Sequence, residues 1–418
     1  MIRFLHTADL HIDSPLKGLD VYPGAPVERI RYATRRAFEN VIDLAIKQRV
    51  QFMIIAGDLF DGDWRIVESR LWTIGQFKRL GDAGIQVVTM RGNHDAANRV
   101  DGLLPWPSNV REFSVETPET IVLETLGVAL HGQGYPRAAV WEDLTENYPA
   151  AVPGMTNIGV LHTSLAGHPQ HDNYAPTSLE QLLSKNYDYW ALGHIHTREV
   201  IRPNRPAIVF PGNPQGRHIR EAGAKGCYLV EMADGDTTLT FQPTDVLRWE
   251  LIEVALTEQC DLEDLYDSVH SHLRASIKKA AKRFLALRLQ INGNCRAHEQ
   301  LTGSSARDAA IARIRQLGME HSNQLWIERV RLDTAPAMDW DELRRGNDLF
   351  AQLLQAIDQI ANDDQQLMAI ANDLEGLSRK AGSELFEAGI RFDDPVELRR
   401  WLRNAESLLF PLIAKTKT

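Results

Sequence analysis

The feature of this sequence that most constrains its fold is a set of five polar motifs, each placed where a hydrophobic run ends. Such runs predict buried strands, so each motif is expected in the loop that follows a strand. Loops at the ends of neighbouring strands can bring distant residues to one place, as a dinuclear metal site requires. The five motifs are Asp9-Leu10-His11, Gly57-Asp58-Leu59-Phe60-Asp61, Gly92-Asn93-His94-Asp95, Leu161-His162-Thr163 and Gly193-His194-Ile195-His196.

Strand-like and helical segments alternate in the first part of the chain. Apolar runs at 2–9, 51–56 and 86–90 are separated by helical spacing over about 26–49 and 65–83. This is a βαβ rhythm, so we expect the three strands to be parallel. Shorter strands separated by turns are predicted next, at 120–123, 127–131, 157–162, 187–192, 207–210 and 225–232. The pattern therefore predicts an α/β fold in which two sheets pack face to face and helices flank them.

A new alternation of predicted strands and helices begins at Trp249, which indicates a domain boundary there. We predict a first domain over 1–248, a compact α+β domain over 249–334 and a helical tail over 335–418. A length of 418 residues agrees with two or three domains. The tail is too thinly apolar to form a large core alone. It is expected either to pack on the rest of the chain or to dock a partner.

Composition excludes few functions. The chain is 44% hydrophobic and 24% charged, which is typical of soluble globular proteins. The N-terminus leads straight into the first motif, and no apolar run is long enough to span a bilayer, so we expect a cytoplasmic protein without membrane attachment. A net charge of −10 argues against indiscriminate DNA coating. DNA remains possible, because bound divalent ions would invert the potential of an acidic cleft.

The side chains of the motifs are metal ligands of mixed type. Carboxylate, amide and imidazole groups without a thiolate suit Mn²⁺, Fe²⁺ or Zn²⁺ better than Ca²⁺. We expect two divalent ions, Mn²⁺ foremost, with Asp58 as the bridging carboxylate. Two ions ~3.5–4 Å apart can clamp the attacking and leaving oxygens of a phosphoryl group. The seven expected ligands are Asp9, His11, Asp58, Asn93, His162, His194 and His196.

His94 has a different expected role. It follows a ligand directly, so its ring is expected to face the substrate and to donate a proton to the leaving oxygen. His194 and His196 are two apart in an extended loop and could point to different ions.

The order of these motifs resembles that of the calcineurin-like metallophosphoesterase superfamily. The resemblance implies that Asp58 is shared by the two ions and that His94 is the catalytic acid or transition-state stabiliser. It implies that one ion is held by Asp9, His11, Asp58 and His196. It implies that the other ion is held by Asp58, Asn93, His162 and His194.

A finer resemblance is to the SbcD-type nuclease subunits of DNA-break repair complexes, particularly the YhaO-like branch. It is carried by the ligand motifs together with His131-Gly132-Gln133-Gly134-Tyr135 and the segment 210–217, and it covers about 1–330. It implies a 3′–5′ exonuclease, with endonuclease activity also possible, that acts on DNA. It also implies an SbcC-like coiled-coil ATPase partner, gripped by helical segments such as the tail, and makes a homodimer plausible. In that family the small α+β domain caps the active site and contacts DNA.

Several basic residues are candidate DNA contacts. Arg217, in a Pro/Gly-rich loop, could meet a phosphate or could be an exposed structural arginine. Lys278, Lys279 and Lys282 form a basic stretch that reads either as a solvated helix face or as a contact to the DNA backbone. Asp61 stands where some family members have a substrate-contacting histidine, which leaves its role open.

Two other functions compete with a DNA nuclease. One is a phosphodiesterase or phosphatase acting on nucleotides or other small phosphoesters, because the metal motifs alone do not separate polymer from small substrates. The predicted α+β domain and tail favour the polymer. The other is a mainly structural partner of an ATPase, against which the intact ligand set argues.

Overall fold

The computed structural model describes residues 1–14, 24–61, 66–97, 104–165, 173–337, 344–347, 349–373, 394–403 and 405. The chain forms two compact units. The first contains Met1–Leu251, Ala275–Arg288 and Gly318–Arg329, and the second contains Ile252–Arg274, Leu289–Leu317 and Val330–Thr418. The units interleave along the sequence. The linear domain boundaries expected at 248 and 334 stay predictions.

The first sheet has the strand order β12-β11-β1-β2-β3-β4. Strands β1, β2, β3 and β4 are parallel, which confirms the βαβ prediction, whereas β11 runs antiparallel to β1 and to β12. The strands of the first sheet are β1 (Ile2–Thr7), β2 (Phe52–Ile55), β3 (Gln86–Thr89), β4 (Val110–Glu112), β11 (Gly226–Ala233) and β12 (Asp236–Pro243). The connecting helices are α1 (Val27–Arg31), α2 (Ala33–Gln48), α3 (Ile66–Asp82) and the short α4 (Asn93–Ala96).

The second sheet has the strand order β5-β6-β7-β8-β10-β9. Strands β6, β7, β8 and β10 are parallel, and the edge strands β5 and β9 are antiparallel to their neighbours. Its strands are β5 (Glu119–Leu123), β6 (Val128–Gly132), β7 (Thr156–His162), β8 (Tyr189–Gly193), β9 (Glu199–Arg202) and β10 (Ala207–Phe210). Helix α5 (Leu179–Ser184) precedes β8.

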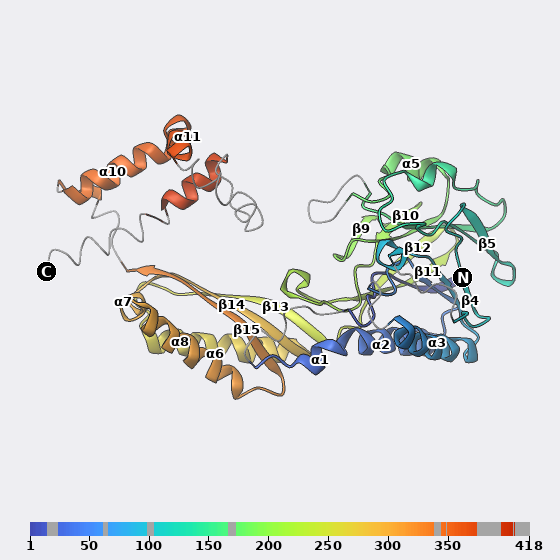
Figure 1. The fold of residues 1–418 in the computed structure, drawn as a ribbon, viewed down its shortest axis with the longest axis horizontal. Helices are drawn as coiled ribbons and strands as arrows, with labels where there is room; N and C mark the ends of the chain where they lie inside the picture. Colours follow the sequence, from blue (N-terminus) through green and yellow to red (C-terminus); the bar gives the residue numbers. More distant parts are fainter. Residues whose placement is uncertain are drawn as a thin grey trace. The chain divides into compact units, whose positions relative to one another are not determined.

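Alternating side chains of each strand make the core. Phe4 and Phe52 point between the sheets and stack with ring centroids 4.8 Å apart, and Tyr189 of the second sheet meets Phe4 edge-on at 5.3 Å. Leu5 and Met53, one position on, face outward beneath α2 and α3. Figure 1 shows α2 and α3 along one outer side of this sandwich and α5 along the other. The predicted α/β fold with two flanked sheets is confirmed.

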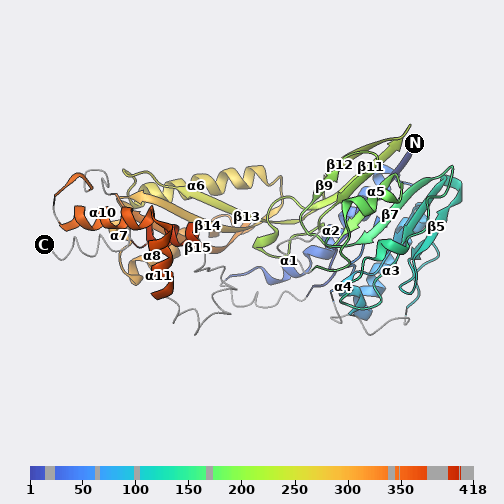
Figure 2. The ribbon, with the colours of Figure 1, turned by 90° about the horizontal axis from the view of Figure 1, so that it is seen from above.

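A third sheet, of order β13-β14-β15, follows along the chain. Helix α6 buries Leu265, Val269 and Leu273, which recur every four residues along one face. Figure 2 shows α6 running alongside the strands. This is the α+β pattern expected after residue 249, although β15 continues through Pro336. The elements are β13 (Leu247–Ala255), α6 (Leu262–Lys279), β14 (Phe284–Cys295), α7 (Ala297–Gln300), α8 (Ser304–Met319) and β15 (Leu325–Pro336).

The described parts of the tail are helical, as predicted. Helices α10 (Leu349–Ala361) and α11 (Asp364–Asp373) precede helical residues over 395–403. Leu367 and Leu398 belong to a small apolar cluster that these segments share. Residue 404 and residues 406–418, which include Leu408 of the last predicted helix, lie outside the described residues. Within the described residues, no helix combines the length and the apolar character that a membrane span needs.

Candidate metal centre

The five motifs lie together at one edge of the sandwich, where the parallel strands of both sheets end. Asp9 follows β1, Asp58 follows β2, Asn93 follows β3, His162 ends β7 and His194 follows β8. Ligand sites of α/β sheets generally form at such carboxyl ends. We call this set of loops the ligand edge.

One group of potential ligands consists of Asp9, His11 and His196, each of which has a ligand atom within 4.8 Å of the others. The Nε2 atoms of His11 and His196 face each other at 3.2 Å. Burial lowers the pKa of His11 well below its usual value, and the charge of Arg217 acts in the same direction. A neutral ring presents a lone pair, so these two nitrogens suit a shared cation.

A second group consists of Asp9, Asp58 and His162. The Nε2 atom of His162 lies 3.4 Å from Asp58 Oδ2 and 3.0 Å from Asn93 Oδ1. Asp58 Oδ2 is also 3.8 Å from Nε2 of His11, in the first group. The Asp58 carboxylate therefore lies between the two groups, where a bridging ligand is needed.

His194 completes the set. Its backbone N–H donates to both carboxylate oxygens of Asp9, at 3.0 and 3.1 Å, and its ring centroid lies 5.2 Å from that of His162. The structure thus brings together all seven side chains that the sequence predicts as ligands. Their mixed oxygen and nitrogen donors fit Mn²⁺, Fe²⁺ or Zn²⁺.

The backbone at the ligand edge is strained. Asp9, His11, Asp58 and His194 adopt φ values of 53°, 44°, 53° and 95°, in the left-handed region that non-glycine residues rarely occupy. Each such residue costs about 1–2 kcal/mol. Strain of this kind collects at functional sites, where the surrounding structure holds it.

Two glycines of the motifs make room for the ligands. Gly57 has φ +91°, and a Cβ atom there would lie 2.4 Å from His162 Nδ1. At Gly92 a Cβ atom would lie 2.3 Å from Asp58 Oδ1. A larger residue at either position would displace a candidate ligand, and at Gly57 the positive φ favours glycine as well.

His94 differs from the ligands because its side chain is 41% exposed, whereas those of His11 and His162 are fully buried. Its Nδ1 lies 2.6 Å from Asp61 Oδ1. Burial opposes the charged ring, but the hydrogen bond to Asp61 and the negative charges of Asp58 and Asp61 together raise the pKa of His94. His94 is also close enough to His11 and Asp58 to act as a ligand.

Asp61, whose role the sequence leaves open, holds the His94 ring. It also accepts a hydrogen bond from Ser14 Oγ at 2.5 Å. Burial acts to raise its pKa, yet the hydrogen bond from His94 and the nearby imidazoles hold the pKa of Asp61 below its usual value. With Nδ1–H of His94 directed to Asp61, Nε2 is the nitrogen left to meet a substrate.

Asp95, the last residue of its motif, ties two loops together. Its buried carboxylate accepts backbone N–H bonds from Leu59, Phe60 and Gly92 at 3.1, 2.9 and 3.1 Å. Burial, reinforced by the charge of Asp58, raises the pKa of Asp95 to about 7. The loops after β2 and β3 are therefore fixed to each other.

Arg217 lies at the ligand edge, and its side chain is only 13% exposed. It pairs with Glu221, a residue that the sequence does not mark, and Glu221 accepts a 2.8 Å hydrogen bond from Nδ1 of His196. The expectation that a structural Arg217 would be exposed is therefore wrong, because its side chain is mostly buried. Lys278, Lys279 and Lys282 are exposed at the end of α6 and in the loop after it, and none belongs to the ligand groups.

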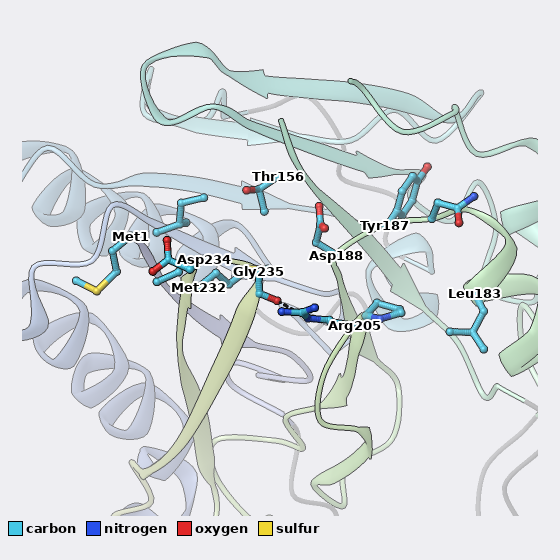
Figure 3. Close-up of a pocket in the computed structure, with 13 residues that line it drawn as sticks. Met1, Thr156, Leu183, Tyr187, Asp188, Arg205, Met232, Asp234 and Gly235 are labelled. Carbon is cyan, nitrogen blue, oxygen red and sulfur yellow. Dashed lines mark hydrogen bonds between the residues drawn. The ribbon is translucent and has the colours of Figure 1, made fainter. Parts of the chain in front are cut away.

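A cavity of about 660 Å³ lies at the starts of the strands (Figure 3). Met1 precedes β1, Thr156 starts β7, and Asp234 and Gly235 form the β11–β12 turn. We call this the cavity edge. Its charged lining residues include Arg205, which donates to the carbonyl of Gly235 at 3.0 Å. No lining residue belongs to the ligand groups, so the hollow is separate from the metal-binding chemistry.

Two family models match the chain. The calcineurin-like phosphoesterase model matches residues 2–198, which include every predicted ligand. The model of the middle domain of metallophosphoesterase YhaO matches residues 249–335.

Three relatives extend these matches. The chain is 36% identical over 292 residues to the uncharacterized metallophosphoesterase YhaO of Bacillus subtilis, covering 69% of this chain and 72% of that protein. It is 26% identical over 245 residues to the DNA double-strand break repair protein Mre11 of Saccharolobus solfataricus, covering 56% and 61%. It is 25% identical over 273 residues to the SbcD component of the nuclease SbcCD of Bacillus subtilis, covering 56% and 67%. The chain therefore belongs to the calcineurin-like metallophosphoesterase family, as its motifs predict.

Proposed function

We propose that this phosphoesterase is a DNA nuclease that uses two divalent ions, preferably Mn²⁺. The observation that carries the proposal is the convergence of the seven predicted oxygen and nitrogen ligands, Asp58 among them, with the 41% exposed side chain of His94 beside them. We propose 3′–5′ exonuclease activity, with endonuclease activity as a second mode.

The ligands divide between the ions as the family resemblance implies. Asp9, His11, Asp58 and His196 would hold one ion, and Asp58, Asn93, His162 and His194 the other. When bound, the ions would supply an activated water and neutralise charge on the phosphoryl group.

His94 acts on the leaving group. Its Nε2 donates a proton to the departing ribose oxygen, while Asp61 holds Nδ1 at 2.6 Å and fixes the ring. The exposure of His94 supports this role, because a proton donor must reach the substrate.

The DNA substrate is supported by the names of two relatives, a DNA double-strand break repair protein and a component of a nuclease. The exposed Lys278, Lys279 and Lys282 offer backbone phosphate contacts. We propose that residues 249–334 form the DNA-contacting cap and that 335–418 dock an SbcC-like ATPase, with a homodimer as the assembly. Deleting 335–418 should then abolish co-purification of the ATPase.

The test uses the full chain, freed of metal and then supplied with Mn²⁺. The substrates are end-labelled single-stranded and duplex DNA, bis(p-nitrophenyl) phosphate and p-nitrophenyl phosphate. We expect Mn²⁺-dependent DNA cleavage, with the label position giving the polarity. Hydrolysis of the small esters without any DNA cleavage would instead assign the chain to nucleotides or other small phosphoesters.

His94→Ala separates the two roles open to His94. We expect kcat on DNA to fall by about 10²–10⁴-fold while both ions are retained. Loss of an ion together with activity, measured by elemental analysis, would make His94 a ligand and remove its role as the acid.

A further inference from the structure

We infer that Arg217 and Glu221 are positioning residues that hold the ligand His196 and the acid His94 in register, and that Arg217 is not a phosphate contact. The inference rests on the proposed hydrolytic function of the metal centre. Its basis is an unbroken series of contacts that crosses the ligand edge. The series is His196 Nδ1–Glu221 Oε1 at 2.8 Å, Glu221 Oε1–Arg217 Nη2 at 3.1 Å, Arg217 Nη1–Asp61 Oδ2 at 3.5 Å and Asp61 Oδ1–His94 Nδ1 at 2.6 Å.

Glu221 fixes the orientation of His196. Its side chain is 6% exposed, and both of its oxygens accept hydrogen bonds. Oε1 accepts from His196, while Oε2 accepts from the Arg217 backbone N–H at 2.7 Å and from Asn213 Nδ2 at 2.9 Å. A carboxylate on Nδ1 leaves Nε2 of His196 facing Nε2 of His11, at 3.2 Å. Such partners of ligand histidines set both tautomer and ring direction.

Arg217 joins this carboxylate to Asp61. Its guanidinium lies between two carboxylates that are themselves largely buried, and its Nε atom is buried as well. The side chain is only 13% exposed and both Nη atoms already face carboxylates, so little of this head group is left for a phosphate to reach. The planar fork of arginine can reach both partners at once, which the single ammonium of lysine cannot do.

The consequence is that one guanidinium couples two distant motifs. His196 follows β8, and His94 lies in α4 after β3. Each ring is oriented by its own carboxylate, and Arg217 sets the spacing of those carboxylates. Small misplacements of reacting groups are costly, about 10²-fold for 1 Å. Loss of Arg217 should therefore reduce turnover and weaken metal binding while leaving DNA affinity in place.

The experiment compares Arg217→Lys, Arg217→Gln and Glu221→Gln with a control, Arg205→Gln, whose side chain is 66% exposed at the cavity edge. We measure kcat and KM on DNA and on bis(p-nitrophenyl) phosphate. Mn²⁺ affinity is measured without substrate by electron paramagnetic resonance, and DNA affinity on metal-free protein by fluorescence anisotropy. Circular dichroism shows that each variant is folded.

We expect the three site variants to lose about 10–100-fold in Mn²⁺ affinity, as found when partners of ligand histidines are removed. At saturating Mn²⁺, kcat should fall at least about 10-fold while KM and DNA affinity stay within about 3-fold, which means that transition-state stabilisation is lost and substrate binding is not. Arg205→Gln should change none of these quantities.

A rise in KM and a loss of DNA affinity, with kcat and Mn²⁺ affinity unchanged, would make Arg217 a phosphate contact and overturn the inference. Unchanged kcat and Mn²⁺ affinity in Arg217→Lys and Glu221→Gln would overturn it equally. If Arg217→Gln does not fold, the results for Arg217→Lys and Glu221→Gln decide whether the inference holds. If the parent protein cleaves no DNA, the small diester and Mn²⁺ binding still test the positioning role, so the two proposals fail separately.

Discussion

The ligand edge and the cavity edge are opposite ends of the same strands, and they differ in what they bury. At the ligand edge, Asp9, Asp58 and His162 are almost fully buried, and buried Asp95 accepts hydrogen bonds from the backbone N–H groups of Leu59 and Phe60. At the cavity edge, Arg205 and Asp236 pair at 3.1 Å with side chains 66% and 75% exposed. The cavity of about 660 Å³ lies at one end, and the convergent oxygen and nitrogen donors lie at the other. The clustering of buried polar side chains, and not the presence of a cavity, indicates where the functional site lies. Burying polar groups is costly unless they have partners, so such a cluster is not expected without a function.

Asp58→Asn should break the ligand edge most severely. It removes the charge of the carboxylate between the two ligand groups, so we expect loss of an ion and a fall in kcat of at least about 10³-fold, equivalent to several kcal/mol of transition-state stabilisation. Elemental analysis and DNA cleavage measure both effects. Asp234→Asn at the cavity edge, where φ of 54° suits asparagine, should alter neither.

Gly57→Ala and Gly235→Ala are a matched pair across the two edges. Both glycines have positive φ, 91° and 81°, so both variants bear the backbone strain of about 1 kcal/mol. Only at Gly57 would the new Cβ press on a buried ring, His162 Nδ1 at 2.4 Å, whereas at Gly235 it meets the exposed end of Arg205 at 3.3 Å. We expect Gly57→Ala to lose about 2–4 kcal/mol of unfolding free energy, by overpacking added to strain, and to lose Mn²⁺ affinity. Equal losses in the two variants would show that the space beside His162 is not critical.

His6 tests whether burial alone makes a histidine part of the chemistry. It lies between the sheets with its own partners, Tyr189 Oη at 2.9 Å and the Leu192 carbonyl at 3.2 Å. Burial lowers the pKa of His6 from 6.5 to about 3. The unfolded chain thus takes up a proton below pH 6.5 that the folded chain refuses. The unfolding free energy is therefore highest above pH 6.5 and decreases as the pH falls towards 3. Between pH 6.5 and 5 the decrease due to His6 is about 2 kcal/mol.

His6→Gln should therefore be less stable at pH 7 but show a shallower decline in unfolding free energy between pH 6.5 and 5, measured by urea denaturation. It should keep its Mn²⁺ affinity, unlike variants of the ligand histidines. A parallel pH dependence in the two proteins would contradict the neutral, buried state of His6.

The smallest expected effect concerns the lysines. Lys278→Gln combined with Lys279→Gln should weaken DNA binding and reduce the salt slope by about 1–2, since each phosphate contact contributes roughly one. Turnover of bis(p-nitrophenyl) phosphate should not change. Lys47→Gln combined with Lys78→Gln, two exposed lysines on α2 and α3, is the control, and an equal loss there would mean that the lysines of α6 have no special role.

The sequence predicts most of the fold because buried strands carry apolar runs. The strands without a predicted run are β4, β9 and β12, and all three lie at sheet edges. An edge strand has fewer neighbours to bury it, and the alternation in β12 is of half-buried and exposed residues. Periodicity therefore carries little signal at such strands.

The convergence of the candidate ligands could be predicted, because these residues stand in motifs at strand ends. Glu221 could not, since it is a lone acidic residue in a short 3₁₀ turn over Ile219–Glu221 and acquires its role only through contacts with His196 and Arg217. The burial of Arg217 could not be predicted either, because it too depends on contacts that only the fold creates. Loops rich in proline and glycine usually lie on the surface, and only the fold supplies the carboxylates that cover it.

The pairing of β1 with β11 has a consequence for how the protein is made. Residues 2–6 of β1 pair with residues 228–232, so one side of the strand that leads to Asp9 finds its partner only after more than half of the chain has been synthesised. Until then β1 exposes an unpaired edge, which is a template for aggregation. A fragment ending at residue 198, where the phosphoesterase match stops, would contain every predicted ligand and still keep that edge open. The nascent chain therefore depends on its own later residues to cover the strand that leads to its first predicted ligand.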